Sequence, residues 1–85
     1  MNQIVQGLLD NARFYRRKGA KYLHKAEVCD SDVYLQEAAK ALAVAQSYYE
    51  TAYRCAADMY GSDTASDMLL DDVDENCRRI DKLPD

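Results

Sequence analysis

The sequence is poor in the residues that build metal sites and disulfide frameworks. It has a single histidine, His24, and three cysteines, Cys29, Cys55 and Cys77, with no Cys-x-x-Cys spacing. An odd cysteine count without paired spacing argues against a disulfide framework and against a zinc site. His24 falls on the polar side of its predicted helix, which favours a solvated side chain over a ligand or a base. The cysteines are interpreted as free thiols, and neither a metal nor a cofactor is expected.

Catalytic motifs and membrane-spanning runs are also missing. The chain contains no G-x-S-x-G, no H-E-x-x-H and no P-loop. Its uncharged runs fall far short of the roughly 18 residues of a membrane span. The first ten residues, MNQIVQGLLD, lack the basic and then apolar order of a signal peptide. These absences predict a protein that is not an enzyme, does not enter a membrane and resides in the cytoplasm.

What the chain has in abundance is alanine, the strongest helix former. Alanine is concentrated between residues 38 and 60, a stretch without Gly or Pro. Apolar residues recur there at alternating spacings of four and three, which defines a heptad seam: Ala38, Leu42, Ala45, Tyr49, Ala52, Ala56 and Met59. Further apolar residues flank the seam and widen the apolar arc to about 180°. A helix that is apolar over so wide an arc needs two neighbouring helices.

The rest of the sequence predicts those two neighbours. Over residues 2–28 the apolar residues form one arc of about 100°: Ile4, Val5, Leu8, Ala12, Tyr15, Gly19, Tyr22, Leu23 and Ala26. Gly7 lies off this arc, so a break near Gly7 is the alternative to one continuous helix. The segment CDSDV at 29–33 supplies N-caps for a helix over 33–60.

Gly61 is well placed to end the second helix. Thr64 and Asp67 then resemble a capping box that opens a third helix over 64–82, with these residues facing inward: Leu69, Val73, Cys77 and Ile80. Short turns make neighbouring helices antiparallel. We therefore predict one all-α domain over residues 1–85, a three-helix antiparallel arrangement in which two long helices form a hairpin and a shorter acidic helix follows.

Charge is divided between the two ends of the chain. Residues 1–27 carry six basic and two acidic residues, whereas residues 62–85 carry three basic and eight acidic ones. One interpretation is that the acidic third helix lies beside the basic first helix and the charges satisfy each other. The other is that one of the two charged faces is a binding surface.

One cluster on the first helix combines aromatic and basic residues. Phe14 falls off the apolar arc, and lysines share its side of the helix, while arginines and two tyrosines border it. Aromatic rings among Lys and Arg suit phosphates and bases, or the acidic groove of a partner. The alternative is that Phe14 is covered by the third helix or by a second copy. The candidate binding residues are Arg13, Phe14, Tyr15, Arg17, Lys18, Lys21, Tyr22 and Lys25.

These features predict a small non-enzymatic binding protein that engages a partner protein or an anionic ligand through this basic-aromatic face. Because a short chain with an alanine-rich core gains stability from association, a homo-oligomer is expected. An alternative is a protein that sequesters a nucleotide or cyclic oligonucleotide, since the chain resembles in size, helix content and charge split many small phage and mobile-element proteins. A second alternative is an acidic decoy that binds a basic partner through the third helix, although Arg78, Arg79 and Lys82 oppose it.

Overall fold

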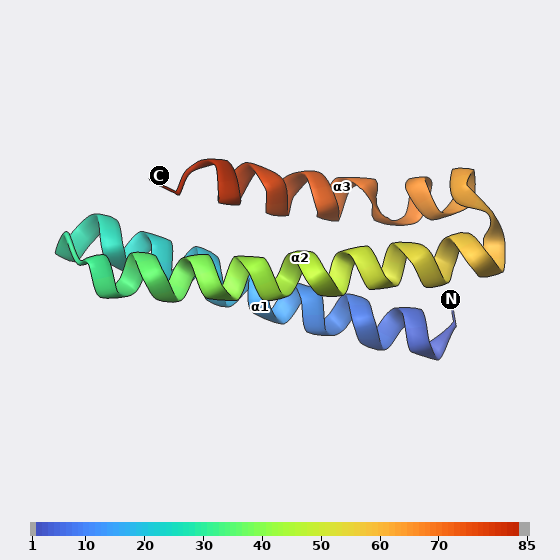
Figure 1. Ribbon diagram of the computed structural model, residues 1–85, viewed down its shortest axis with the longest axis horizontal. Coiled ribbons are helices and arrows are strands. Elements are labelled where there is room, and N and C mark those ends of the chain that lie inside the picture. Colours follow the sequence, from blue (N-terminus) through green and yellow to red (C-terminus); the bar gives the residue numbers. More distant parts are fainter. Residues whose placement is uncertain (1, 84–85) are drawn as a thin grey trace.

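The computed structural model describes residues 2–83, and it folds them into three antiparallel helices (Figure 1). The helices are α1 (Gln3–Cys29), α2 (Asp32–Tyr60) and α3 (Ser62–Asp81). Helix α2 lies between the other two, and α1 and α3 touch each other only sparingly. The molecule is elongated, with extents of 44 × 20 × 15 Å. The predicted all-α, three-helix arrangement is confirmed.

The helix ends follow from local capping. The Asn2 side chain accepts a hydrogen bond from the backbone N–H of Ile4 at 2.7 Å, and α1 then continues through Gly7 without a break. Asp30 takes a left-handed backbone conformation (φ 51°, ψ 51°) that ends α1. Gly61, at φ 90°, ends α2 and donates its N–H to the Ala57 carbonyl at 2.9 Å.

Helix α3 begins two residues earlier than the sequence predicted. It starts at Ser62, directly after Gly61, and no side chain makes a capping hydrogen bond to its first turn. The predicted capping box of Thr64 and Asp67 is therefore wrong. Because Gly61 alone turns the chain, Thr64 is already inside the helix and cannot act as its N-cap.

The main core forms where all three helices meet. It joins residues of the α2 seam with three residues of α1 and two of α3: Ala45, Tyr49, Ala52, Ala56, Val5, Leu9, Ala12, Ala65 and Leu69. The predicted seam on α2 is buried from Ala38 to Ala56, and only Met59, near the end of α2, is exposed. The small seam residues allow α1 and α3 to approach α2 on adjacent sides.

Two inward-facing sets of residues differ from those predicted. On α1 Leu9 is fully buried, whereas Ile4 is 63% exposed. On α3 Asn76 is buried and Cys77 is exposed. The physical reason is that the core joins α1 to both α2 and α3, so the buried side of α1 is the one that carries Leu9. On α3 the buried side likewise carries Asn76 and not Cys77. None of the three helices, over the residues described, is both long enough and apolar enough to cross a membrane.

Helices α1 and α2 approach each other closely at Gly19. A Cβ atom at this position would lie 2.7 Å from the side chain of Leu42 and 3.4 Å from the Ala38 carbonyl oxygen. Leu42 is itself fully buried, so it has no free space to move into. At Gly7, by contrast, a Cβ atom would meet nothing within 4 Å.

We expect opposite results from the same substitution at these two glycines. Gly7→Ala should raise the free energy of unfolding by about 0.5–1 kcal/mol, because Ala is the better helix former. Gly19→Ala gains the same helix propensity but overpacks the helix contact, so it should be less stable than Gly7→Ala by about 1–3 kcal/mol. Urea unfolding of both variants measures this difference. Equal stability of the two would show that α1 does not pack closely on Leu42.

Candidate anion-binding face of α1

Phe14 lies on the surface of α1 and is the most exposed aromatic ring of the predicted cluster. It is 58% exposed, so the interpretation that α3 covers it is wrong. Phe14 lines a shallow hollow of about 350 Å³ together with Arg17, Lys18 and Lys21. We call these four residues the basic-aromatic face. They come from two consecutive turns of one helix, so the helix fixes their spacing.

The cations of the basic-aromatic face have no acidic partner in the part of the chain that the structure describes. Arg17, Lys18 and Lys21 are exposed, and none of them forms an ion pair with another residue in the range 2–83. Like charges three and four residues apart on a helix repel each other. Three neighbouring cations therefore leave an unbalanced positive potential around the Phe14 ring.

Arg13 and Arg16 of α1 reach toward α3. Arg13 Nη2 donates to Asp72 Oδ2 and Arg16 Nη1 to Asp72 Oδ1, each at 2.9 Å. Arg16 Nη1 also lies 3.4 Å from Glu75 Oε2 and donates to the Tyr49 hydroxyl at 3.2 Å. The basic first helix and the acidic third helix thus satisfy each other at this point. Arg13, a predicted binding residue, is engaged inside the fold.

Burial and charge shape the ionisation of this internal cluster. Burial raises the pKa of Asp72, but the hydrogen bonds from Arg13 and Arg16 outweigh it and hold that pKa below its ordinary value. Burial also raises the pKa of the Tyr49 hydroxyl. Because the Arg16 side chain is only 13% exposed, this group of residues is a structural link between α1 and α3.

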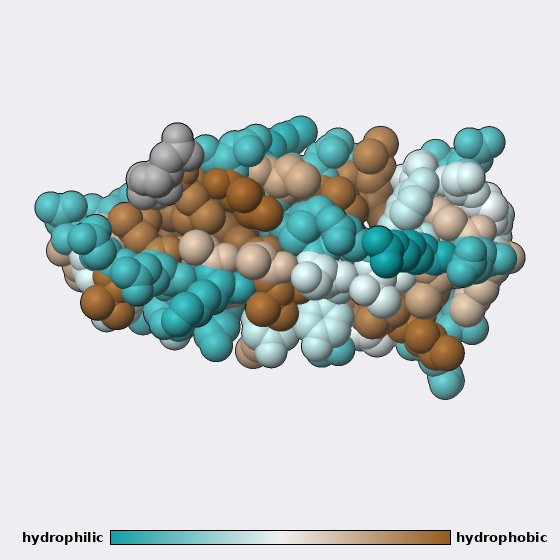
Figure 2. Space-filling model, in the orientation of Figure 1, coloured by the Kyte–Doolittle hydropathy of each residue, from teal (hydrophilic) through white to brown (hydrophobic). Residues whose placement is uncertain are grey.

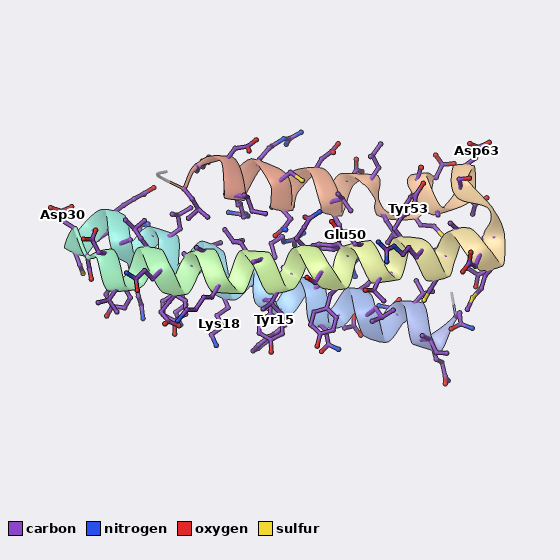
Figure 3. The ribbon with its side chains drawn as sticks, viewed as in Figure 1. Tyr15, Lys18, Asp30, Glu50, Tyr53 and Asp63 are labelled. Atoms are coloured by element: carbon purple, nitrogen blue, oxygen red, sulfur yellow. The ribbon has the colours of Figure 1, made fainter. Side chains whose placement is uncertain are left out.

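The predicted tyrosines on α1 stack on tyrosines of α2. The rings of Tyr15 and Tyr48 are nearly parallel, with centroids 5.9 Å apart and an angle of 10°. Phe14 meets the Tyr15 ring edge-on at 5.2 Å. Figure 3 shows Tyr15 and Lys18 projecting on the side of α2 that is remote from α3. Tyr15 therefore contacts both Tyr48 and Phe14, and Phe14 is the more exposed ring, which a ligand can reach.

A second pair of stacked tyrosines joins α1 and α2 near the turn between these two helices. Tyr22 and Tyr34 lie 6.0 Å apart at an angle of 24°, and Lys25 Nζ is 5.7 Å from both ring centroids. A cation over an aromatic ring is attracted by its negative face. Lys25 and Tyr22 thus contribute to the contact between α1 and α2, within about one helical turn of Lys21.

Comparison of the chain with protein-family models, with curated proteins and with solved structures finds no match. Any functional conclusion therefore rests on the chemistry of the protein's surfaces. Of the eight residues predicted from the sequence, the structure brings four together on the basic-aromatic face and places Tyr15 directly beside them. Arg13 and the pair Tyr22 and Lys25 lie elsewhere.

The sequence carried a signal for Arg16 and Asp72 that the prediction did not use. The buried residues of α1 follow spacings of four and three from Val5 to Ala26, and Arg16 occupies the one polar position of that series. Asp72 and Asn76 occupy polar positions of the matching series on α3, between Ala65 and Leu83. Residues of opposite charge at the seam positions of two helices indicate an ion pair between those helices.

Proposed function

We propose that the protein is a non-enzymatic cytoplasmic binding protein that engages an anionic ligand or an acidic partner protein through the basic-aromatic face. One observation carries this proposal: an exposed aromatic ring, Phe14, stands among three cations that have no partner among residues 2–83. Carboxylate or phosphate groups would remove the repulsion between the cations, and a planar or apolar group would cover the ring.

The surroundings of this face support an anionic partner. Arg13 and Arg16 have acidic partners within the fold, whereas Arg17, Lys18 and Lys21 project into solvent. A guanidinium and two ammonium groups offer many hydrogen-bond donors and no acceptor. A ligand that contacts them must therefore supply acceptors, which phosphates and carboxylates do best.

We infer further that the binding protein works as a homo-oligomer. Its core is built largely from alanine, which buries little apolar area per residue, and the chain is short. Large apolar side chains also stay exposed on several faces, among them Val28, Val33 and Leu70. Association would cover part of this surface and add stability that the small core does not supply.

A nucleotide or cyclic oligonucleotide, as sequestered by small phage and mobile-element proteins, is the second candidate ligand. The observation that favours it is the Phe14 ring beside Arg17, since a base can stack on the ring while its phosphate meets the guanidinium. Tyr15 and Tyr22 are already stacked on α2, which leaves one ring for one base. The acidic decoy is not favoured, because Asp72 and Glu75 are engaged with arginines.

A charge reversal on α1 tests the proposed binding face. The probes are a fluorescein-labelled oligo-aspartate peptide and a fluorescent ATP analogue, titrated by anisotropy at several salt concentrations. We expect affinity to fall as salt rises, because ions screen and compete for the contacts. Arg17→Glu with Lys21→Glu should abolish binding of the preferred probe and leave the thermal melt unchanged, because both residues are exposed.

Two further variants make this test decisive. Arg78→Glu with Lys82→Glu is the matched control, because it reverses two exposed cations at the C-terminal end of α3 and should leave the affinity close to that of the wild type. Phe14→Ala should weaken binding of the ATP analogue by about 1–3 kcal/mol if the base stacks on the ring. A protein that binds either probe equally well after reversal of Arg17 and Lys21 would disprove this binding face.

A further inference from the structure

A second hollow lies on a different part of the surface, between α2 and α3. It has a volume of about 350 Å³ and is lined mainly by apolar groups, with one charged residue of each sign. Its lining includes Tyr53, Leu70, Val73, Glu50 and Arg54. Figure 3 shows Glu50 and Tyr53 between the two helices on the face toward the viewer. We call this feature the α2–α3 groove.

The apolar surface of the groove continues along α3. Leu70 is 54% exposed, and Val73, Cys77 and Ile80 follow it at spacings of three and four, so they form one stripe beside the buried seam. Figure 2 shows hydrophobic residues gathered over α2 and α3 on this face. An apolar stripe of this length, rimmed by polar residues, is typical of a surface that is covered by another protein.

The two charges of the groove are arranged so that the surface complements a copy of itself. Glu50 and Arg54 are one helical turn apart on α2, and both are exposed. Neither forms an ion pair with any residue of the described chain, and Glu50 only accepts a 3.5 Å hydrogen bond from Gln46. In a twofold contact with antiparallel α2 helices, Glu50 of each copy faces Arg54 of the other.

The size of the face also fits a dimer. Seen down its shortest axis, the molecule measures 44 by 20 Å (Figure 1). A second copy laid over most of this face would cover about 800 Å² on each subunit, which is the area of a standard stable interface. The exposed alanines Ala39 and Ala43 on α2 present no bulky side chain that would hold a second copy away.

We propose that the α2–α3 groove is the interface of a homodimer. Two copies pack these faces together about a twofold axis, with Leu70 of each copy entering the hollow beside Tyr53 of the other and with Glu50 opposite Arg54 in both directions. This interface rests on the oligomer proposed above and specifies its surface. It leaves the basic-aromatic face free on both subunits, so the dimer presents two binding faces.

Replacing Leu70 tests the apolar centre of the interface. The dimer dissociation constant of the full chain is measured by sedimentation equilibrium over a range of concentrations. Leu70→Glu should raise it by about 30-fold or more, because the change places an unpaired charge in the middle of the contact. Val28→Glu, which adds the same charge at an exposed apolar site on α1, is the matched control and should leave it unchanged. Circular dichroism checks that both variants remain helical.

A charge-swap cycle tests the self-complementary pairing. Glu50→Arg alone and Arg54→Glu alone each bring like charges together across the twofold axis, so each should weaken the dimer about tenfold. The double variant Glu50→Arg with Arg54→Glu restores opposite charges in both directions and should recover wild-type affinity. A wild-type mass near 9.7 kDa at every concentration would overturn both this interface and the proposed oligomer. A dimer that tolerates Leu70→Glu, or that the double swap fails to restore, would overturn this interface alone.

Discussion

Leu9→Ala is expected to lower the free energy of unfolding by about 2–5 kcal/mol, because it leaves a cavity where the three helices meet. Leu9 is fully buried in α1 and belongs to the same cluster as Tyr49 on α2 and Leu69 on α3. The other members of this cluster are mostly alanines, which are too small to fill the space that Leu9 would vacate. A domain of this size has only about 5–15 kcal/mol of stability in total.

Leu8→Ala is the matched control for this prediction. Leu8 is the same residue type on the same helix turn, but it is half-buried and borders a surface hollow with Val44 and Tyr48. Its truncation should cost about 1 kcal/mol, since less apolar area is removed from contact and water can enter the gap. Urea unfolding at one fixed protein concentration compares the two. If Leu8→Ala costs as much as Leu9→Ala, the orientation of α1 described above is incorrect.

The orientation of α2 could be predicted from the sequence, whereas that of α1 could be predicted only in part, because its arc missed Leu9 and included Ile4. On α2 the small and apolar residues form one wide arc without a competing apolar face, and the heptad seam along this arc is buried. On α1 both Ile4 with Leu8 and Val5 with Leu9 supply plausible apolar faces. The choice between them depends on the position of α3. That position is a matter of tertiary packing, which the apolar periodicity of a single helix does not predict.

The candidate site was predictable to a similar degree. Placing Phe14, Arg17, Lys18 and Lys21 on one side of a helix requires only helix geometry, and they share one hollow. Separating Arg13 from them requires knowing that Asp72 comes within 2.9 Å of its side chain. That distance is set by the packing of α3 on α2. Charge counts alone therefore predicted an attraction between α1 and α3, but not which residues form the ion pairs.

Asp72 links α3 directly to α1. It accepts hydrogen bonds from two arginines, and one of these, Arg16, also donates to the hydroxyl of Tyr49 on α2. Asn76, one turn further along α3, donates to the Leu42 carbonyl at 3.3 Å and to Gln46 at 3.0 Å. Polar residues at buried seam positions favour one register, because any shift of a helix leaves them without partners. We infer that these contacts fix the position of α3 along the bundle.

Asp72→Asn should therefore lower the free energy of unfolding at pH 7 by about 1–3 kcal/mol, since it removes the charge that both arginines contact. Asp71→Asn is the matched control, because Asp71 is the adjacent residue and is exposed. It should change the free energy of unfolding by less than about 0.5 kcal/mol. Urea unfolding followed by circular dichroism measures both, and similar values for the two variants would mean that the ion pairs of Asp72 contribute nothing to stability.

The same ion pairs predict how stability responds to acid. Because the pKa of Asp72 is lower in the folded protein, the unfolded chain binds more protons than the folded one as the pH falls. The stabilisation is thus complete above the pKa of about 4 of an unfolded Asp and is lost as the pH drops through the lower folded value. Glu75, whose pKa is lowered by its hydrogen bond from Arg79 and by the charge of Arg16, acts in the same direction.

We expect urea unfolding between pH 7 and pH 2 to show this loss in the wild type and a smaller loss in Asp72→Asn. The two proteins should differ most near neutral pH and converge at the acid end, where Asp72 of the wild type is protonated and no longer attracts Arg13 and Arg16. Asp71→Asn should follow the wild-type curve. Parallel curves for the wild type and Asp72→Asn over the whole range would show that the acid sensitivity arises from other carboxylates and that Asp72 does not hold α1 and α3 together by its charge.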